Sequence, residues 1–355
     1  MTNPLTKIVF LIPSLDPDER MCPYIDELIA AGAKHILLVD DGSRAENKKY
    51  FKEASKHKEV EVLTHAVNQG KGRGLKTGIN HVLNNMPRIE GVVTADSDGQ
   101  HSCEDTINTA YKLLEIGNIV LGTRDFNDPS VPFKSRNGNK ITTKVFKLLY
   151  GKTINDTQTG LRGLPRDFLK ECMALPGERF EYEIQMLIKM VKDNREITEL
   201  PIKTIYDSKE NHQTHFNPIK DSIKIYRVMF ASFFMYIGAS LTSTVIDLVL
   251  FSLLTMIPNK SATVNIFIAT AGARAVSSFV NYTLNRTTVF KSKKSIRETI
   301  LKYYTVVACR VLCSAALVSL LYYLLQFNKT LLKVVVDALL FLVTYKIQNK
   351  WVFKD

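Results

Sequence analysis

Hydrophobic positions divide the chain into two stretches with different patterns. Up to about residue 228, short apolar runs alternate with polar and amphipathic segments. After that residue, the chain consists mainly of long apolar runs separated by polar links. Most of these runs are long enough to cross the roughly 30 Å hydrocarbon layer of a membrane as helices. The pattern predicts an α/β domain over residues 1–228 and an all-helical membrane domain over residues 229–355.

The first stretch predicts strands that alternate with helices. Strands are expected at residues 7–13, 35–39, 60–63, 91–95 and 201–206, and helices at residues 23–31 and 75–83. Such alternation indicates a parallel α/β sheet, whose ligands bind at the carboxyl ends of the strands. Four residues lie at or just beyond such ends: Pro13, Asp41, Lys71 and Asp96. We expect them to share one site.

The second stretch predicts four membrane-spanning helices, at about residues 230–257, 262–284, 303–325 and 331–347. The last is interrupted by charges. The link at residues 285–302 is rich in lysine and arginine, so the positive-inside rule places it, and with it the α/β domain, in the cytoplasm. A helix at about residues 218–228 mixes apolar and basic residues, which is typical of a helix on a membrane surface.

Two further features of the second stretch carry information. Residues 285–290 (NRTTVF) resemble residues 349–353 (NKWVF), which suggests a repeat of helical hairpins. Each predicted span contains one ionisable residue of interest: Asp247, Arg274, Arg310 and Asp337. Charges at this depth are costly and normally pair. We expect the pairs Asp247–Arg274 and Asp337–Arg310, which either hold the helices together or let one arginine reach a lipid phosphate.

Composition narrows the function classes. A net charge of +12 favours an anionic partner, and the apolar second stretch makes this a membrane surface rather than nucleic acid. The five cysteines form no Cys-x-x-Cys pair and no cluster with histidine at zinc spacing. The apolar run at residues 8–12 is too short for the core of a signal peptide.

Two aspartates one residue apart, Asp96 and Asp98, follow the predicted strand at residues 91–95. Mg²⁺ and Mn²⁺ take oxygen ligands and usually reach a protein through one or two carboxylates plus substrate phosphates. The pair therefore predicts a clamp for a metal-bound diphosphate, with a plain acidic turn as the alternative. The basic turn at residues 70–74 fits neither the Walker nor the dinucleotide pattern, but it still suits an anion before a helix.

Several motifs together resemble glycosyltransferase family 2, and most closely its polyprenyl-phosphate hexosyltransferase branch. They are Ile12-Pro13, Val39-Asp40-Asp41-Gly42-Ser43, Asn68-x-Gly70-Lys71-Gly72, Asp96-x-Asp98-Gly99-Gln100-His101, Gly122-Thr123-Arg124, and the stretches 156–162 and 180–183. The resemblance covers about residues 5–228. It implies a GT-A fold, dependence on Mg²⁺ or Mn²⁺, and inversion of the anomeric centre.

The resemblance also implies roles for individual residues. The nucleotide would be held by Pro13, Leu15, Asp16, Asp41 and Lys71, and the metal and diphosphate by Asp96, Asp98 and Gln100. Arg124 and Arg136 would hold the acceptor phosphate, with solvated surface arginines as the alternative. Further substrate contacts are expected from Asp156, Gln158 and Glu181. Glu181 and Glu183 would either touch the sugar or only favour the start of a helix. The family usually shows Pro-Ala-Tyr-Asn-Glu after the first strand. Residues 13–19 (PSLDPDE) depart from this pattern, which leaves the acid of this loop unassigned.

Residues 229–355 resemble the GtrA-like family, which is implicated in handling polyprenyl-linked sugars. The two resemblances imply transfer of a hexose from a nucleotide sugar to undecaprenyl phosphate, for modification of a cell-envelope glycan. UDP-glucose is the favoured donor, with GDP-mannose and UDP-N-acetylglucosamine as alternatives. The GtrA-like half would dock the lipid, flip the sugar-lipid, or only anchor the enzyme. Because four helices are few for a translocation path, flipping would require a homo-oligomer.

Overall fold

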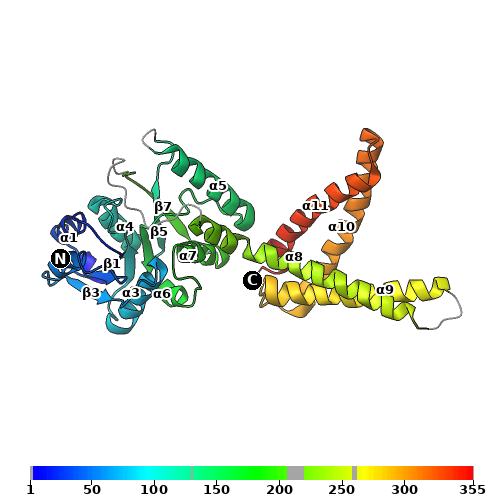
Figure 1. Ribbon diagram of the computed structural model, residues 1–355, viewed down its shortest axis with the longest axis horizontal. Helices are drawn as coiled ribbons and strands as arrows, with labels where there is room; N and C mark the ends of the chain where they lie inside the picture. The colour runs from blue at the N-terminus through cyan, green and yellow to red at the C-terminus, as the bar shows by residue number, and fades with distance from the viewer. Residues whose placement is uncertain (1–2, 129–130, 206–219, 258–261, 355) are drawn as a thin grey trace. The chain divides into compact units, whose positions relative to one another are not determined.

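The computed structural model describes residues 3–128, 131–205, 220–257 and 262–354. Its contacts divide the chain into two compact units, Met1–Met229 and Phe230–Asp355. The elements of each unit are labelled in Figure 1. Each unit is described by itself below.

The first unit is built around a seven-stranded sheet, in the order β3-β2-β1-β4-β6-β5-β7 within the described residues. The strands are β1 Ile8–Ser14, β2 Ile36–Asp40, β3 Val60–Thr64, β4 Gly91–Thr94, β5 Ile119–Arg124, β6 Arg162–Pro165 and β7 Ile197–Ile202. The helices are α1 Met21–Ala30, α2 Lys48–Ala54, α3 Lys71–Asn85, α4 Cys103–Ile116, α5 Phe133–Tyr150, α6 Arg166–Met173 and α7 Glu181–Lys192, with the 3-10 helix η1 at Pro4–Lys7.

The prediction of an all-parallel sheet is wrong at β6, which runs antiparallel to both β4 and β5. The remaining strand pairs are parallel. A parallel pairing needs a crossover connection from one end of the sheet to the other. Here the chain leaves β5, forms α5 and enters β6 from the edge at which β5 ends, so no crossover is made. The sheet is mixed, and β6 starts where its neighbours stop.

The last strand also differs from its prediction. β7 covers Ile197–Ile202 rather than residues 201–206. It pairs with β5 at the edge of the sheet, and Pro201, which lacks a backbone N–H, falls near its end, a position that proline tolerates in an edge strand. Residue 206 and the predicted loop at residues 207–217 lie outside the described residues.

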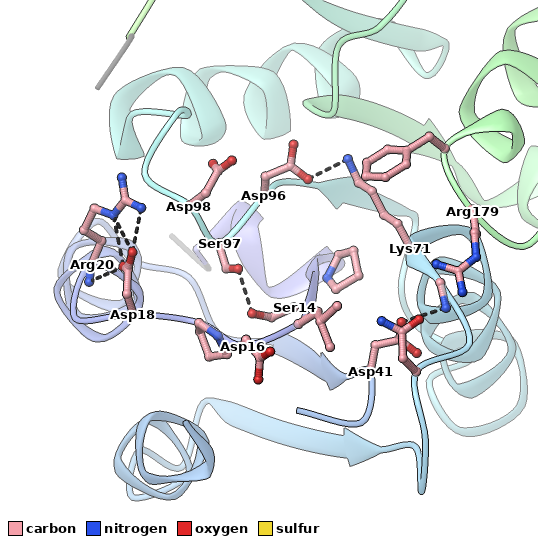
Figure 2. Close-up of a pocket in the computed structure, with 16 residues that line it drawn as sticks. Ser14, Asp16, Asp18, Arg20, Asp41, Lys71, Asp96, Ser97, Asp98 and Arg179 are labelled. Atoms are coloured by element: carbon pink, nitrogen blue, oxygen red, sulfur yellow. Dashed lines mark hydrogen bonds and ion pairs between the residues drawn. The ribbon is translucent and has the colours of Figure 1, made fainter. Parts of the chain in front are cut away.

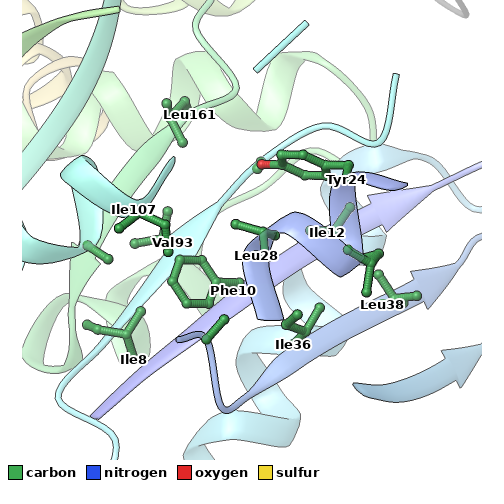
Figure 3. Close-up of a cluster of buried hydrophobic side chains, with 14 of the residues drawn as sticks. Ile8, Phe10, Ile12, Tyr24, Leu28, Ile36, Leu38, Val93, Ile107 and Leu161 are labelled. Carbon is green, nitrogen blue, oxygen red and sulfur yellow. The ribbon is translucent and has the colours of Figure 1, made fainter. Parts of the chain in front are cut away.

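Helices cover both faces of the sheet, as expected for strands that are continuous apolar runs. Alternate residues of a strand point to opposite faces. In β1, Phe10 belongs to a fully buried cluster with side chains of α1 and α4, among them Leu28 and Ile107 (Figure 3). Its neighbour Leu11 lies instead against Gly78 of α3, where an added Cβ would collide with it. This core fixes the position of the central strands, whose ends carry the site residues.

We expect Phe10→Ala to lower the unfolding temperature of the first unit by about 10 °C, because deleting a buried phenylalanine costs about 3–5 kcal/mol. Differential scanning fluorimetry of the full chain measures this. Val67→Ala is the matched control, since Val67 is 65% exposed and its truncation should shift the transition by less than about 2 °C. Equal shifts for the two variants would contradict the assigned core.

The second unit is helical. Its elements are the part of α8 (Lys220–Thr255) from Phe230 onward, α9 Ala262–Leu284, η2 Asn285–Val289, α10 Ile296–Leu325, α11 Lys329–Ile347 and η3 Gln348–Val352. Because α8 begins at Lys220, the predicted membrane-surface helix at residues 218–228 is the first part of α8 rather than a separate element. Residues 218 and 219 lie outside the described residues.

Three helices in the described residues are long and apolar enough to cross a membrane: Lys220–Thr255, Thr263–Val289 and Ile296–Leu325. The fourth predicted span corresponds to α11, which forms a helix but is not among these three. It carries Lys333, Asp337 and Lys346, and charges of this number reduce its apolar character. The structure therefore supports a helical membrane region with three apolar spans.

The sequence repeat in this unit has a structural counterpart. Both η2 and η3 are π-helices, and each continues directly from the second helix of a hairpin. In both, the backbone N–H of a phenylalanine, Phe290 or Phe353, donates a hydrogen bond of 2.9 Å to the carbonyl five residues earlier. The two phenylalanine rings stack on each other with centroids 5.2 Å apart. The hairpins α8–α9 and α10–α11 are therefore similar in construction.

One of the two predicted membrane ion pairs forms. Arg274 lies 3.3 Å from the Asp247 carboxylate. Asp337, however, pairs with Lys333 at 2.9 Å and not with Arg310, so that prediction is wrong. Lys333 stands one helical turn before Asp337 on the same face of α11 and reaches it without crossing between helices.

Candidate active site

Two adjoining cavities lie at the edge of the sheet where β1, β2 and β4 end and β6 begins. Cavity A has a volume of about 160 Å³ and is lined by the loop after β1 together with Asp41 (Figure 2). Cavity B has a volume of about 180 Å³ and is lined by residues that include Arg124. Four residues line both cavities and form the boundary between them: Lys71, Asp96, Asp98 and Phe180.

Lys71 links two carboxylates at this boundary. Its Nζ lies 2.7 Å from Asp96 Oδ1 and 3.0 Å from Glu183 Oε1. Burial alone would lower the pKa of Lys71, but Asp96 and Glu183 outweigh burial and raise that pKa above its ordinary value. Burial would likewise raise the pKa of Asp96, but Lys71 and His101 outweigh it and lower that pKa. Lys71 and Asp96 are therefore both charged at neutral pH.

Asp98 is in a different electrostatic state from Asp96. Burial, together with the negative charge of Asp96, raises the pKa of Asp98. Its Oδ1 accepts one hydrogen bond, of 3.1 Å, from the backbone N–H of Gln100. A cation placed against both carboxylates would relieve their repulsion. The pair is therefore chemically suited to a positively charged ligand.

The donor set fits Mg²⁺ or Mn²⁺ bound together with a substrate phosphate. No cluster of three or more His, Cys, Asp or Glu side chains that could hold a metal occurs in the described part of the chain. Two carboxylates and the Gln100 amide still fit these ions, because they take their other ligands from phosphates and water. His101 is 5% exposed and lies 3.5 Å from Asp96 Oδ2, and within the described residues its ring nitrogens have no hydrogen-bond partner.

Asp41 fixes the loop that carries Lys71. Its Oδ1 accepts a hydrogen bond of 2.9 Å from the Gln69 N–H, and its Oδ2 accepts one of 2.7 Å from the Gly70 N–H. His65 lies against Asp41 on the other side, with Nδ1 2.7 Å from Oδ1. Gly70 has φ +105°, and an added Cβ there would collide with the Glu178 carbonyl oxygen. Asp41 therefore lines cavity A and also positions the start of α3.

The loop after β1 forms the opposite wall of cavity A. Pro13, Leu15 and Asp16, which the resemblance assigns to the nucleotide, all line it. Asp16 accepts hydrogen bonds from the backbone N–H and the Nε of Arg44, at 2.8 and 2.9 Å, and these bonds tie the loop to the segment after β2. Asp18 pairs with Arg20 on the same wall (Figure 2). Two of the three acids of this loop, Asp16 and Asp18, therefore line the cavity, and each forms an ion pair with an arginine.

Arg124 lines cavity B together with Lys71. Its Nε donates a hydrogen bond of 2.7 Å to Asp156, and its NH2 donates one of 3.2 Å. Asp156 is fully buried and also accepts from the Gln158 N–H at 3.1 Å. The guanidinium lies over the Phe126 ring, 5.1 Å from its centroid. Asp156 therefore fixes the orientation of the Arg124 guanidinium without lining the cavity. Gln158 lines cavity B itself.

Two residues implied by the resemblance lie outside both cavities. Arg136 donates a hydrogen bond of 2.8 Å to the carbonyl oxygen of Asp128. Glu181 accepts bonds of 3.2 and 3.3 Å from the backbone N–H groups of Glu178 and Arg179, just before α7. In the described residues, neither Arg136 nor Glu181 lines cavity A or B.

Sequence reasoning missed several residues of the site. Of the two glutamates in the motif at residues 180–183, only Glu181 was counted among the site residues, yet Glu183 is the one that contacts Lys71. Arg20, Arg179 and Phe180 line cavity A without belonging to a polar motif at a strand end. The sequence signal for Glu183 was the spacing of Glu181 and Glu183 on either side of the buried Tyr182. Residues two apart in a helix point in nearly opposite directions, so one of the two glutamates had to face the interior.

Comparisons with known proteins identify the class. Residues 12–173 match the model of glycosyl transferase family 2, and residues 234–353 match the GtrA/DPMS transmembrane domain. The chain belongs to glycosyltransferase family 2, with a mixed α/β domain followed by a GtrA/DPMS transmembrane domain. The protein is a membrane glycosyltransferase, as the sequence motifs indicated.

Its relatives include transferases to polyprenyl phosphates. An uncharacterized protein of Methanocaldococcus jannaschii is 31% identical over 56% of this chain and 82% of that protein. The UDP-N-acetylglucosamine–dolichyl-phosphate N-acetylglucosaminyltransferase of Methanococcus voltae is 27% identical over 56% of this chain and 86% of that enzyme. The undecaprenyl-phosphate 4-deoxy-4-formamido-L-arabinose transferase of Yersinia pestis is 24% identical over 49% of this chain and 53% of that enzyme.

Proposed function

We propose that this glycosyltransferase moves a hexose from a nucleotide sugar to undecaprenyl phosphate and inverts the anomeric centre. The observation that carries the proposal is the pair of adjoining cavities, which meet at Lys71, Asp96 and Asp98. One cavity leads from the carboxylate pair to the loop after β1, and the other leads to Arg124. A transferase needs this arrangement, because donor and acceptor must meet at the sugar carbon.

The nucleotide sugar would occupy cavity A, with its diphosphate beside Asp98. A bound Mg²⁺ or Mn²⁺, held by Asp96, Asp98 and Gln100, would neutralise the leaving diphosphate. Lys71 would hold Asp96 in place and contribute a second positive charge at the boundary. Asp41 would keep the loop of Lys71 in position. These side chains therefore bind and orient the donor, and none of them needs to act as a strong base.

The lipid phosphate would occupy cavity B against Arg124. A phosphate oxygen attacks the sugar C1, a new C1–O bond forms, and the C1–O bond to the diphosphate breaks as the nucleoside diphosphate leaves. The phosphate is already ionised near pH 7, so cationic positioning matters more than proton removal. The planar fork of arginine suits phosphate oxygens. Asp156 would keep that fork oriented toward the cavity.

UDP-glucose is the favoured donor in this proposal, with GDP-mannose and UDP-N-acetylglucosamine as alternatives. The name of the Methanococcus voltae relative supports the third of these. The α/β unit would lie in the cytoplasm, because the basic link between α9 and α10 favours that side. The GtrA/DPMS domain would hold the enzyme at the membrane that contains its acceptor.

A panel of radiolabelled nucleotide sugars tests the proposal. Membranes that contain the full chain are incubated with each donor, and the lipid-soluble product is extracted and counted. We expect transfer from one donor, dependent on added undecaprenyl phosphate and abolished by EDTA. Mild acid should release the intact sugar from the product. Release of free sugar into water, with no labelled lipid, would contradict a lipid acceptor.

Arg124→Lys is expected to raise the KM for undecaprenyl phosphate about tenfold or more, because lysine keeps the charge and loses the planar fork. Affinity for the nucleoside diphosphate, measured by calorimetry, should stay within about twofold of wild type. We choose lysine over alanine because removing all charge would leave the buried Asp156 unpaired, which is strongly destabilising. A large loss of nucleotide affinity at unchanged acceptor KM would assign Arg124 to the donor.

A further inference from the structure

The segment 177–180, which precedes α7, is held to α3 by several contacts. Lys76 Nζ donates a hydrogen bond of 2.8 Å to the Gly177 carbonyl oxygen and lies 3.1 Å from Glu178 Oε1. The Arg73 N–H donates one of 2.9 Å to the Glu178 carbonyl oxygen, and Arg73 Nε lies 2.7 Å from Glu178 Oε2. Lys76 is 6% exposed, and lysines are almost never this deeply buried unless they are paired. These contacts therefore fix the position of the segment.

The segment places two side chains, Arg179 and Phe180, in the wall of cavity A. Phe180 also lines cavity B, at the boundary where the two cavities meet. The stem of Arg179 packs across Gly70, because an added Cβ at Gly70 would collide with Arg179 Cγ. Gly70 directly precedes Lys71, and Arg179 lies on the Lys71 side of cavity A, across from Arg20 (Figure 2). Arg179 is therefore close to the boundary between the cavities.

Arg179 differs from the other two cations that line cavity A. Arg20 pairs with Asp18 at 2.6 Å, and Lys71 pairs with Asp96 at 2.7 Å. Arg179 lines the cavity as an exposed side chain, and it forms no ion pair with a carboxylate in the part of the chain that the structure describes. Its charge is therefore available to an anion that enters the cavity.

The two glutamates nearest to Arg179 in the sequence do not pair with its guanidinium. Glu178 directs its carboxylate to α3, where it contacts a lysine and an arginine. Glu181 accepts hydrogen bonds of 3.2 and 3.3 Å from the backbone N–H groups of residues 178 and 179. Both carboxylates thus hold the segment in place and leave the guanidinium to a ligand.

We propose that Arg179 binds the diphosphate of the nucleotide sugar directly, in addition to the metal. The inference rests on the proposed function, which places that substrate in cavity A. The diphosphate must lie near the boundary of the cavities, because the sugar attached to it must reach the acceptor. Arg179 lies close to that boundary, and its planar fork fits two phosphate oxygens. Asp96 and Asp98 repel a diphosphate, so a further cation beside the metal favours its binding.

The same contact favours the reaction itself. Negative charge builds up on the diphosphate as its bond to the sugar C1 breaks, so a fixed cation stabilises the transition state more than the bound substrate. Lys76 and Arg73 are positioning residues here. They do not touch the substrate, and they hold the segment 177–180 so that Arg179 lines the cavity.

Calorimetric titration of the full chain with UDP and with GDP tests the contact, once in Mg²⁺ and once in EDTA. We expect Arg179→Gln to weaken binding of the preferred diphosphate at least about tenfold in both conditions, because a charge-assisted contact is lost. The corresponding nucleoside, which carries no phosphate, should bind wild type and variant within about twofold of each other.

Arg88→Gln is the matched control, because Arg88 is an exposed arginine that lines neither cavity. It should bind both nucleotides as wild type does. Unchanged diphosphate affinity of Arg179→Gln would overturn the proposal, and so would an equal loss for the nucleoside. A loss seen only in Mg²⁺ would also overturn it, since Arg179 would then act through the metal.

Lys76→Met tests the positioning role. Methionine fills the space of the lysine stem and removes only the ammonium, and thermal unfolding establishes that the variant folds. We expect diphosphate affinity to fall about threefold in the wild-type background and to stay unchanged in the Arg179→Gln background, because Lys76 acts through Arg179. Equal losses in the two backgrounds would overturn this role of Lys76.

Transfer assays on the same samples separate this proposal from the proposed function. If wild type labels no lipid from any nucleotide sugar, yet binds a nucleoside diphosphate through Arg179, the lipid-acceptor proposal fails and the Arg179 proposal stands. If wild type transfers sugar to undecaprenyl phosphate and Arg179→Gln binds the diphosphate as wild type does, the reverse holds.

Discussion

Asp98→Asn is expected to reduce sugar transfer at least about a hundredfold, since it removes an anionic ligand from the place where the diphosphate must be neutralised. Asparagine keeps the shape of the side chain, so the fold should be unaffected. Asp96→Asn should be at least as damaging, because it also removes the 2.7 Å ion pair with Lys71. Transfer is measured with saturating donor across a titration of Mg²⁺ and Mn²⁺.

Calorimetry separates loss of metal binding from loss of chemistry. Wild type should bind nucleoside diphosphate more tightly with metal than without it, and Asp98→Asn should lose that difference. Asp26→Asn is the control, because Asp26 is an exposed carboxylate of α1 whose partner is His57. It should behave as wild type in both assays. Normal turnover by Asp98→Asn in excess Mn²⁺ would refute the assigned site.

Gly160→Ala should have a comparable effect without changing any charged residue. A Cβ at position 160 would collide with the Asp96 carboxylate, which must then move away from Lys71. The backbone here is held by the Thr94 hydroxyl, which donates a 2.7 Å hydrogen bond to the Gly160 carbonyl, so the loop cannot easily yield. We expect transfer to fall at least about a hundredfold, as for loss of an electrostatic contact in the transition state.

Gly138→Ala is the matched control for this substitution. Gly138 lies in α5, and no atom lies within 4 Å of the position its Cβ would occupy. Alanine should leave activity unchanged and stabilise the helix by up to about 1 kcal/mol. Circular dichroism and thermal unfolding establish that both variants fold. Full activity of Gly160→Ala would mean that the position of Asp96 is not critical.

The central strands could be predicted because burial on both faces imposes an uninterrupted apolar run. β1 and β2 have such runs, and Pro13 near the end of β1 and Asp41 just after β2 both lie in the site. β6 could not be predicted in this way. It is four residues long and begins with Arg162, which is 1% exposed and bonded to the carbonyls of Thr159 and Glu183. From sequence alone, an arginine predicts an exposed loop position, because the carbonyl groups that compensate its burial lie on other segments.

Site residues could be predicted where one short segment supplies them. They were harder to predict where the contact joins segments that are distant in the sequence. Asp96 and Asp98 could be identified from local sequence, because a strand end delivers both. The contact of Lys71 with Glu183 depends on the packing of α7 beside α3, which no local pattern encodes. The direction of Glu181 and Glu183 depends on the phase of α7, and the buried Tyr182 sets that phase.

The paired π-helices give the helical unit an internal symmetry, in which each hairpin matches the other. Phe290 and Phe353 occupy equivalent places in the two halves and stack on each other, as matching residues do across the axis of a symmetric dimer. Aligned on these π-helices, Arg274 and Asp337 occupy equivalent positions and carry opposite charges. Two identical copies would have placed like charges at both positions. A single chain can therefore carry opposite charges at two positions that a symmetric dimer would have to make identical.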